Sequence, residues 1–184
     1  MQVIDGQARG AAERVAMLNN RWVARSKQQW LDEEQQQAWI ALVHLMIRLP
    51  AVLDAQLRRD AEMSHFEYQI LAALSMAPGR SMRMSDLAAV TEGSLARLSQ
   101  AAGRLERRGW LRRTQDPDDG RCTLAVLNDA GEKKVHDAAP GHVGAVREIV
   151  FASLSRTQIR QLTTTAHRVL ETIERLDDAG SSEI

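Results

Sequence analysis

The sequence is poor in cysteine, in lysine and in excess charge of either sign. A single cysteine, Cys122, stands among 184 residues, so a disulfide framework within the chain is excluded. Only three of the 24 basic residues are lysine, and 24 acidic residues bring the formal net charge to zero. A prediction of nucleic-acid binding therefore cannot rest on total charge and needs local clusters of basic residues.

The sequence also lacks a long apolar run. The longest, residues 39–47, has nine residues and contains His44, whereas a helix that spans a membrane needs about 20. The first residues show no basic start followed by an apolar core, which is the pattern of a signal peptide. We therefore expect a cytoplasmic protein without a membrane partner. Its 44% apolar and 26% charged residues are ordinary for a soluble fold.

Motifs of catalysis and of cofactor binding are missing. The chain contains no GxSxG, no Walker loop, no GxGxxG and no HExxH. None of its histidines lies three or four residues from another histidine or from the cysteine (His44, His65, His136, His142 and His167). We therefore expect no enzyme, no cofactor and no metal site.

Residues 85–90 are predicted to form a short helix. Ser85 can cap this helix, because its hydroxyl can accept a hydrogen bond from an amide of the first turn. Asp86 then lies where the helix dipole favours a negative charge. The chain turns at residues 91–93, where Gly93 permits a tight backbone.

A second helix is predicted from its N-cap, Ser94, to Arg108, and Gly109 supplies the left-handed position that often follows a helix. One apolar stripe at helical spacing is expected to face the core (Leu95, Leu98, Ala102 and Leu105). A polar stripe has the same spacing (Arg97, Gln100 and Arg104). Six arginines and one acid between residues 97 and 113 give this stretch a net charge of +5 (Arg97, Arg104, Arg107, Arg108, Arg112 and Arg113 against Glu106).

A β-hairpin is predicted after this helix. Residues 110–114 and 121–127 have the composition of strands, and residues 115–120 between them have that of a turn. Residues 80–84 could add a short strand that pairs with the hairpin. A helix with a basic face followed by a basic hairpin suits the major groove of DNA and the neighbouring phosphates.

This stretch resembles the DNA-binding core of the MarR family of transcriptional regulators. The most specific part of the resemblance is the following set of residues: Asp119-x-Arg121, Leu127, Gly131, Arg104-Leu105-Glu106 and Arg108-Gly109. The resemblance extends more weakly over residues 32–176. Asn128 stands where the family usually has threonine, and asparagine caps a helix equally well.

The resemblance implies a homodimer that binds double-stranded DNA and is released from it by a small acidic or aromatic effector. It implies that the second helix enters a major groove, and that Arg121, held by Asp119, enters the adjacent minor groove. We expect the DNA contacts to come from Ser94, Arg97, Ser99, Gln100, Arg104, Arg113, Asp119 and Arg121.

Simpler alternatives remain for these residues. The polar stripe could be a solvated helix face, and the pair of Asp119 and Arg121 could be a surface ion pair worth about 0–1 kcal/mol. Cys122 lies beside Arg121, and we expect a structural thiol there rather than a redox switch.

Long helices are predicted on both sides of the segment that holds the helix-turn-helix and the β-hairpin, which we call the winged segment. Residues 32–60 have an apolar face, and Pro50 within them is expected to kink the helix. Residues 64–76 begin with the spacing of a capping box between Ser64 and Glu67. The apolar face of this helix is expected to enter the core (Phe66, Ile70, Leu71 and Leu74).

Asn128 is expected to cap a helix that reaches about residue 139. Pro140 either kinks this helix or separates it from a second one that ends near residue 153, with its valines inward (Val143, Val146 and Val150). A further helix starts at a capping box formed by Ser155 and Gln158. It carries a heptad seam (Ile159, Leu162, Ala166, Val169, Ile173 and Leu176), which favours a two-fold dimer interface over packing within one chain.

The first 31 residues are either a frayed start or an extension with a helix at residues 8–18. A ligand pocket is expected between the helical lobe and the winged segment. Its candidate residues are Trp22, Trp30, Trp39, Arg58, Arg59 and His65. For each tryptophan the alternative is packing in the core.

We therefore predict a mainly α fold with a small β-hairpin wing, in which a winged helix-turn-helix is joined to a helical dimerisation lobe. The expected divisions are an N-terminal extension (1–31), the lobe (32–62 and 128–178), the DNA-binding domain (63–127) and a frayed tail (179–184). The predicted function is that of a DNA-binding regulator, most simply a repressor. The alternatives are a winged-helix module that binds protein, and an oxidative or metal sensor.

Overall fold

The computed structural model describes residues 30–181, and the chain divides into two compact units, residues 1–49 and 50–184. The described part of the first unit is mainly the beginning of helix α2 (Glu33–Ala61), and the rest of α2 belongs to the second unit. The predicted extension at residues 1–31, including the helix at residues 8–18, lies almost wholly outside the described residues.

Helix α2 begins with a reciprocal cap. The carboxylate of Asp32 accepts from the amide of Gln35 at 2.8 Å, and the side chain of Gln35 accepts from the amide of Asp32 at 3.1 Å. In the first unit most large apolar side chains of α2 are exposed (Trp39, Ile40, Leu42, Leu45, Met46 and Ile47). In the second unit, Leu53 and Leu57 of the same helix are buried.

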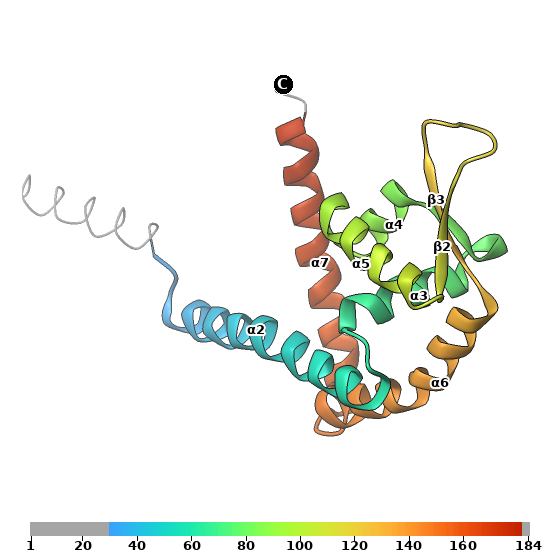
Figure 1. Ribbon diagram of the computed structural model, residues 1–184. Coiled ribbons are helices and arrows are strands. Elements are labelled where there is room, and N and C mark those ends of the chain that lie inside the picture. Colours follow the sequence, from blue (N-terminus) through green and yellow to red (C-terminus); the bar gives the residue numbers. More distant parts are fainter. Residues whose placement is uncertain (1–29, 182–184) are drawn as a thin grey trace, which may run out of the picture. The chain divides into compact units, whose positions relative to one another are not determined.

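The second unit is a winged helix-turn-helix followed by two further helices, as the sequence predicts (Figure 1). After α2 its elements are α3 (His65–Met76), η1 (Pro78–Arg80), β1 (Ser81–Arg83), α4 (Met84–Val90), α5 (Leu95–Arg107), β2 (Leu111–Gln115), β3 (Thr123–Leu127), α6 (Asp129–Val146), η2 (Arg147–Phe151) and α7 (Arg156–Ser181).

Three antiparallel strands form the wing, in the order β1-β3-β2. Strand β1 pairs with β3 through Met82 and Ala125, so the short strand expected at residues 80–84 is present. Strand β2 pairs with β3 through Leu111 and Leu127, and the hairpin extends away from the helices (Figure 1). The strands begin one or two residues later than predicted.

The core of the second unit lies between α3, α4, α5 and the sheet. Its largest fully buried side chains are Leu57, Met63, Ile70, Leu71, Leu74, Leu87, Leu98, Leu105 and Leu111. The buried face of α5 differs from the prediction at its first residue. Leu95 is 56% exposed, because it lies in the first turn, before the helix reaches the core, and Ala101 is buried instead.

Most predicted helix caps are confirmed. Ser64 and Glu67 form the capping box of α3, and Ser94 and Asn128 cap α5 and α6. The cap predicted at Ser85 is wrong. Helix α4 begins one residue earlier, and its N-cap position is occupied by Arg83, which makes no side-chain cap; the Ser85 hydroxyl bonds Asp86.

The turn between α4 and α5 uses its glycine for space rather than for backbone conformation. The positive φ, +50°, falls on Glu92 and not on Gly93. A Cβ placed at Gly93 would lie 2.7 Å from the ring of Phe66, closer than real Cβ contacts come. Gly93 therefore lets the first turn of α5 approach α3.

One joint connects the end of α5, the start of the wing and the start of α6. Gly109 has φ +70° and ends α5 as predicted. The side chain of Asn128 donates to the carbonyl of Gly109 at 2.7 Å, and its amide donates to the carbonyl of Trp110 at 3.3 Å. A Cβ at Gly131 would lie 2.0 Å from that Trp110 oxygen, so only glycine fits there.

Helix α6 continues through Pro140 to Val146 and then passes into the π-helical turn η2, so Pro140 does not divide it into two helices. Val143 was expected to face inward, but it is exposed. Helix α7 starts at the predicted capping box of Ser155 and Gln158 and reaches Ser181, past the residue where the tail was expected to fray.

Helices α2 and α7 each leave several large apolar side chains exposed. On α7, five apolar side chains are between 42% and 67% exposed (Leu162, Val169, Leu170, Ile173 and Leu176). Helix α2 is long and apolar enough to cross a bilayer by length and composition alone, with a mean hydropathy of 1.6 in its most apolar window. These criteria alone do not establish a membrane span, because the core helix of a soluble protein or a signal sequence meets them as well.

Candidate nucleic-acid interface

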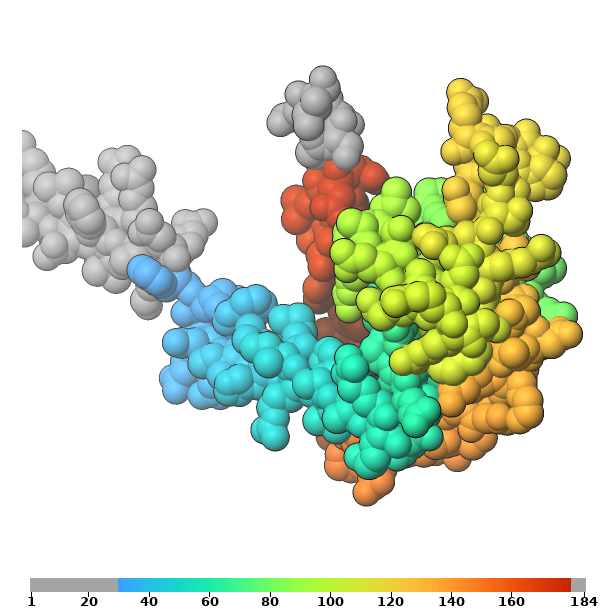
Figure 2. All heavy atoms as spheres, in the orientation of Figure 1, coloured from blue at the N-terminus to red at the C-terminus, as the bar shows by residue number. Residues whose placement is uncertain are grey.

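The exposed face of α5 carries the polar stripe that the sequence predicts. The hydroxyl of Ser94 accepts from the amide of Arg97 at 3.2 Å and fixes the start of the helix. Leu98 and Leu105 anchor the opposite face in the core. Three polar side chains of α5, together with Ser99, are exposed (Arg97, Gln100 and Arg104). Figure 2 shows that α5 and the hairpin both reach the surface of the second unit.

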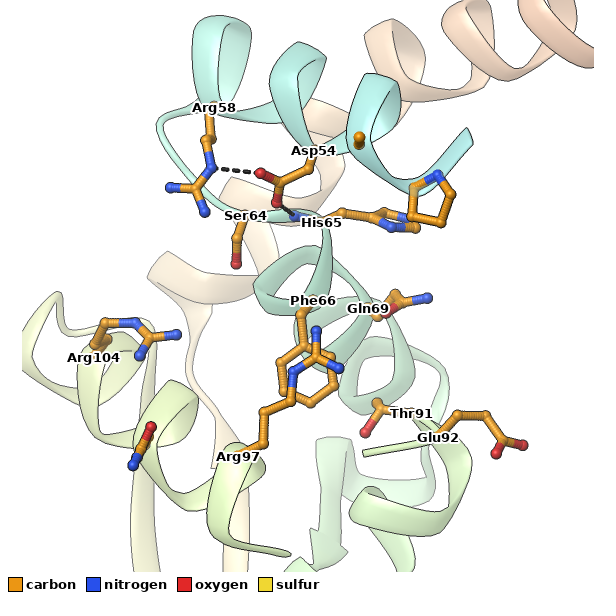
Figure 3. A pocket seen from close by; sticks show the side chains of 13 residues that line it. Asp54, Arg58, Ser64, His65, Phe66, Gln69, Thr91, Glu92, Arg97 and Arg104 are labelled. Carbon is orange, nitrogen blue, oxygen red and sulfur yellow. Dashed lines mark hydrogen bonds and ion pairs between the residues drawn. The ribbon is translucent and has the colours of Figure 1, made fainter. Parts of the chain in front are cut away.

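Two neighbouring residues of α3 hold two arginines of this stripe. The guanidinium of Arg97 lies over the ring of Phe66, with its central carbon 4.0 Å from the ring centroid (Figure 3). The Nε of Arg104 donates to a carboxylate oxygen of Glu67 at 2.8 Å. Phe66 and Glu67, neighbours in the first turn of α3, therefore contact two guanidinium groups that lie two helical turns apart on α5.

Glu67 is almost fully enclosed, yet it stays ionised. Burial by itself raises the pKa of its carboxyl, but hydrogen bonds from the Ser64 amide and from Arg104 outweigh burial and bring the pKa below its ordinary value. A second guanidinium, that of Arg108, lies 4.0 Å from the same carboxylate. The buried charge is thus paired, which is the condition for its being tolerated inside a protein.

The loop at the end of the wing carries an exposed arginine, Arg121, which pairs with Asp119. The side chain of Arg121 is 93% exposed, and its Nε lies 3.2 Å from Asp119, as the sequence suggests. Hydrogen bonds from the amide and side chain of Arg121 lower the pKa of Asp119. Below the tip, Arg83 of β1 donates to the buried carboxylate of Asp116 at 2.7 Å, which ties the hairpin to the sheet.

Arg113 is already bound by a carboxylate of α5. Its guanidinium donates to Glu106 through two nitrogens, at 2.8 and 3.0 Å, and its amide donates to the same side chain at 2.8 Å. These bonds lower the pKa of Glu106. Among the described residues Arg112, the preceding residue of β2, has no ion-pair partner and is exposed.

A cavity of about 600 Å³ lies between α2, α3 and α5 in the second unit. It brings predicted ligand residues, Arg58 and His65, together with three predicted DNA residues (Arg97, Gln100 and Arg104). Arg58 is paired with Asp54, whose other oxygen accepts from the His65 amide at 2.9 Å (Figure 3). The remaining predicted DNA residues, Ser94, Ser99, Arg113, Asp119 and Arg121, do not line this cavity.

Two of the three tryptophans expected near the ligand lie within the described residues. Trp22 lies outside the described residues, and Trp30 and Trp39 are 78% and 53% exposed. Neither of these two side chains packs in the core of the single chain, which was the alternative for them. Within residues 30–181 no group of three or more histidine, cysteine, aspartate or glutamate side chains is placed to hold a metal ion.

Cys122 sits beside carboxylates that disfavour its thiolate. Burial and the neighbouring Asp119, whose carboxylate lies 3.5 Å from the sulfur, raise the pKa of the thiol. A thiol reacts with oxidants as the thiolate, so this environment favours a structural role.

The sequence did not reveal the contacts made by Phe66 and Glu67 with α5. Phe66 was assigned to the core, and Glu67 to the cap of its own helix. Both assignments are correct, but each side chain has a second partner that is distant in sequence. The available signal was the pair of arginines on one face of α5, which needed either solvent or partners on a facing helix.

Residues 63–121 match the sequence model of the MarR family. Among curated proteins, the transcriptional repressor MprA of Escherichia coli (strain K12) is 23% identical over 113 residues, a match that covers 61% of this chain and 64% of MprA. The chain thus spans less than two thirds of the length of this curated relative.

Solved structures match over a longer stretch. Sco3205, a MarR family transcriptional regulator from Streptomyces coelicolor in complex with DNA, is 40% identical. The match covers 78% of this chain and 89% of that chain, with a TM-score of 0.75. The PcaV transcriptional regulator from the same organism, in complex with its natural ligand, is 25% identical, covering 70% of this chain and 90% of that chain with a TM-score of 0.59.

Proposed function

The chain belongs to the MarR family of transcriptional regulators, and from this membership we propose that it binds a pseudo-palindromic operator in double-stranded DNA as a homodimer. The main support is the exposed polar stripe on α5. The chain is also 40% identical to a regulator whose structure was solved in complex with DNA. Arg97 and Arg104 can each donate two hydrogen bonds to guanine, and Gln100 can pair with adenine.

The other predicted contacts position these side chains on the duplex. Ser94 and Ser99 can bond phosphates or base edges, and Arg121 suits a narrow minor groove with strongly negative potential. Arg113 can reach a phosphate only if it leaves Glu106, so Arg112 is the better candidate on β2 for such a contact.

The homodimer is supported by the apolar side chains that α7 exposes. An isolated α7 with this heptad seam would leave a contiguous apolar stripe in water, and a second copy of the chain would cover it by a two-fold contact. Two α5 helices would then lie about one turn of DNA apart. A cytoplasmic repressor that blocks a promoter is the simplest role for such a dimer.

We include in this proposal an effector with an anionic or aromatic group that binds in the cavity of the second unit. The cavity is lined by Arg58 and His65 as well as by Arg97 and Arg104. An anion there would compete with DNA for the same guanidinium groups. PcaV, which is similar in fold, was solved with a natural ligand, and this supports a search for one here.

Selection of bound sequences from a random duplex pool, followed by gel-shift titration at two salt concentrations, tests the proposal. We expect a two-fold symmetric site and an affinity that falls steeply as salt rises. Arg97→Ala should cost about 1–3 kcal/mol of binding free energy and relax specificity at one base pair. Absence of duplex binding at low salt would favour the alternative, a winged helix that binds protein.

A further inference from the structure

We propose that the first turn of α3 determines the base specificity of α5 without touching DNA, because Phe66 and Glu67 hold the guanidinium groups of Arg97 and Arg104 in place before the duplex arrives. This inference rests on the proposed function. It assigns to these two residues a positioning role beyond core packing and helix capping.

Glu67 can act as a fixed support because both of its carboxylate oxygens are engaged. One oxygen accepts from the Ser64 amide at 2.9 Å in the capping box, and the other accepts from Arg104 at 2.8 Å. The Ser64 hydroxyl in turn accepts from the Glu67 amide at 3.2 Å. The carboxylate therefore has one orientation, set by the backbone of its own helix.

Arg104 is held in a way that leaves its outer nitrogens for a partner. Glu67 occupies Nε, while the two terminal nitrogens are the ones that can donate side by side to a guanine edge. The arginine side chain remains 45% exposed. A guanidinium that is already fixed loses less conformational entropy when it binds, and it loses more binding energy when the base is wrong.

Phe66 provides the matching support for Arg97. One part of its ring fills the space that Gly93 leaves at the start of α5, where a Cβ would come within 2.7 Å. The ring is thereby locked, and the Arg97 guanidinium lies over it at 4.0 Å (Figure 3). Cation–π attraction of this kind stabilises one orientation of the guanidinium.

The ion pair with Glu67 also offsets the positive charge of Arg104. A free Arg104 would attract any phosphate, since that attraction does not depend on sequence. Pairing with a carboxylate reduces this general attraction while the terminal donors stay available. Glu67 should therefore raise the ratio of specific to non-specific affinity, and not simply the affinity.

The decisive variant is Glu67→Gln. Glutamine keeps the volume and the capping box, because its side-chain oxygen can still accept from the Ser64 amide, but it removes the charge that holds Arg104. The probes are the duplex selected from a random pool, single-base substitutions of that duplex, and an unrelated duplex of equal length. Affinity is measured at two salt concentrations, and folding is checked by thermal unfolding.

We expect the ratio of affinities for the selected and unrelated duplexes to fall at least about fivefold in Glu67→Gln, with affinity for the unrelated duplex equal to or above that of wild type. In an Arg104→Ala background the same substitution should leave the ratio unchanged, because the group it positions is gone. Glu132→Gln, which removes a carboxylate paired with Arg80 at the start of α6, is the matched control and should leave the ratio at its wild-type value.

Equal losses for both duplexes, or no change in the ratio, would overturn the inference and leave the proposed function standing. Failure of the wild type to bind any duplex would overturn both. If Glu67→Gln does not fold, the same affinity ratio is measured for Phe66→Leu. Leucine keeps an apolar side chain against Gly93 but removes the ring beneath Arg97, so the ratio should fall in this variant as well. An unchanged ratio in that variant would equally overturn the inference.

Discussion

The winged domain and helix α7 differ in the exposure of their apolar side chains. In the winged domain, residues 63–127, every leucine of α3, α4 and α5 except Leu95 is enclosed by elements of the same chain. On α7 the apolar side chains of the heptad seam are largely exposed. The winged domain thus buries its apolar side chains against other elements of the same chain, whereas those of α7 stay exposed in the single chain.

The largest expected effect comes from placing charge on the exposed seam of α7. The double variant Val169→Glu and Ile173→Glu should raise the dissociation constant of the dimer at least about 1000-fold, because a two-fold contact would bury four carboxylates. Sedimentation equilibrium measures this change, and operator binding should disappear with the dimer.

The matched control is Gln161→Glu with Thr164→Glu, which adds the same charge to other faces of α7. It should stay dimeric. A dimer that persists in the Val169 and Ile173 variant would show that another surface joins the subunits. The winged domain should remain folded in both variants, since its core does not depend on α7.

A cavity in the winged domain should have the next largest effect. Leu105 is fully buried, and Leu105→Ala should lower the free energy of unfolding by about 2–5 kcal/mol. Leu95→Ala on the same helix should change it by less than about 0.5 kcal/mol, since Leu95 is mostly exposed. Urea unfolding measures both, and similar losses would mean that Leu95 is covered in the assembled protein.

Two glycines of α6 should respond in opposite directions. Gly131→Ala places a methyl group against the Trp110 carbonyl, and we expect a loss of about 1–3 kcal/mol in the free energy of unfolding. A Cβ at Gly144 meets nothing within 4 Å, so Gly144→Ala should stabilise the helix by about 0.4–1 kcal/mol. A gain at both positions would contradict the close approach at Gly131.

The smallest effect should be a pH dependence centred on α3 and α6. The rings of His65 and His142 lie with their centroids 5.5 Å apart and their planes tilted by 42°, and burial is the main cause of the lowered pKa of each. Asp54 acts in the opposite direction on His65, and His65 adds to the lowering at His142. Both pKa values lie below that of an unfolded histidine.

The unfolded chain therefore binds more protons, and this part of the stability is present above about pH 6.5 and is lost as the pH falls through the lower folded values. Thermal unfolding between pH 7.5 and 5 should show the loss. His142→Gln should flatten the profile, and His167→Gln, on the exposed surface of α7, should not. Parallel profiles for all three proteins would contradict the assignment.

Local signals in the sequence predicted the fold well. Ser94, Gly109 and the capping box of Ser64 and Glu67 depend on contacts within four residues, and each is found where it was expected. Helical spacing also identified the two faces of α5. It could not show how deep each position lies, so Leu95 was placed in the core, and it could not reject a cap at Ser85 when the helix starts one residue earlier.

The candidate site was predicted as a set of residue types rather than as a set of contacts. The binding of Arg113 by Glu106 depends on where strand β2 crosses α5, and that crossing is set by packing of the whole domain. The same is true of Phe66 and Glu67, which reach α5 from more than 25 residues away in sequence. Spacing rules describe one element at a time, so contacts between elements lie outside them.

The hydrogen bonds of Asn128 have a mechanical consequence. They join the carbonyl groups of Gly109 and Trp110 to the first turn of α6, and the absence of a side chain at Gly131 leaves no gap between these segments. Helix α5 and the wing are therefore joined to the first turn of α6 through these contacts. In the proposed dimer on DNA, a rotation of α6 should move α5 and the hairpin together, so an altered angle between the subunits would change both the span between half-sites and the depth of the wing.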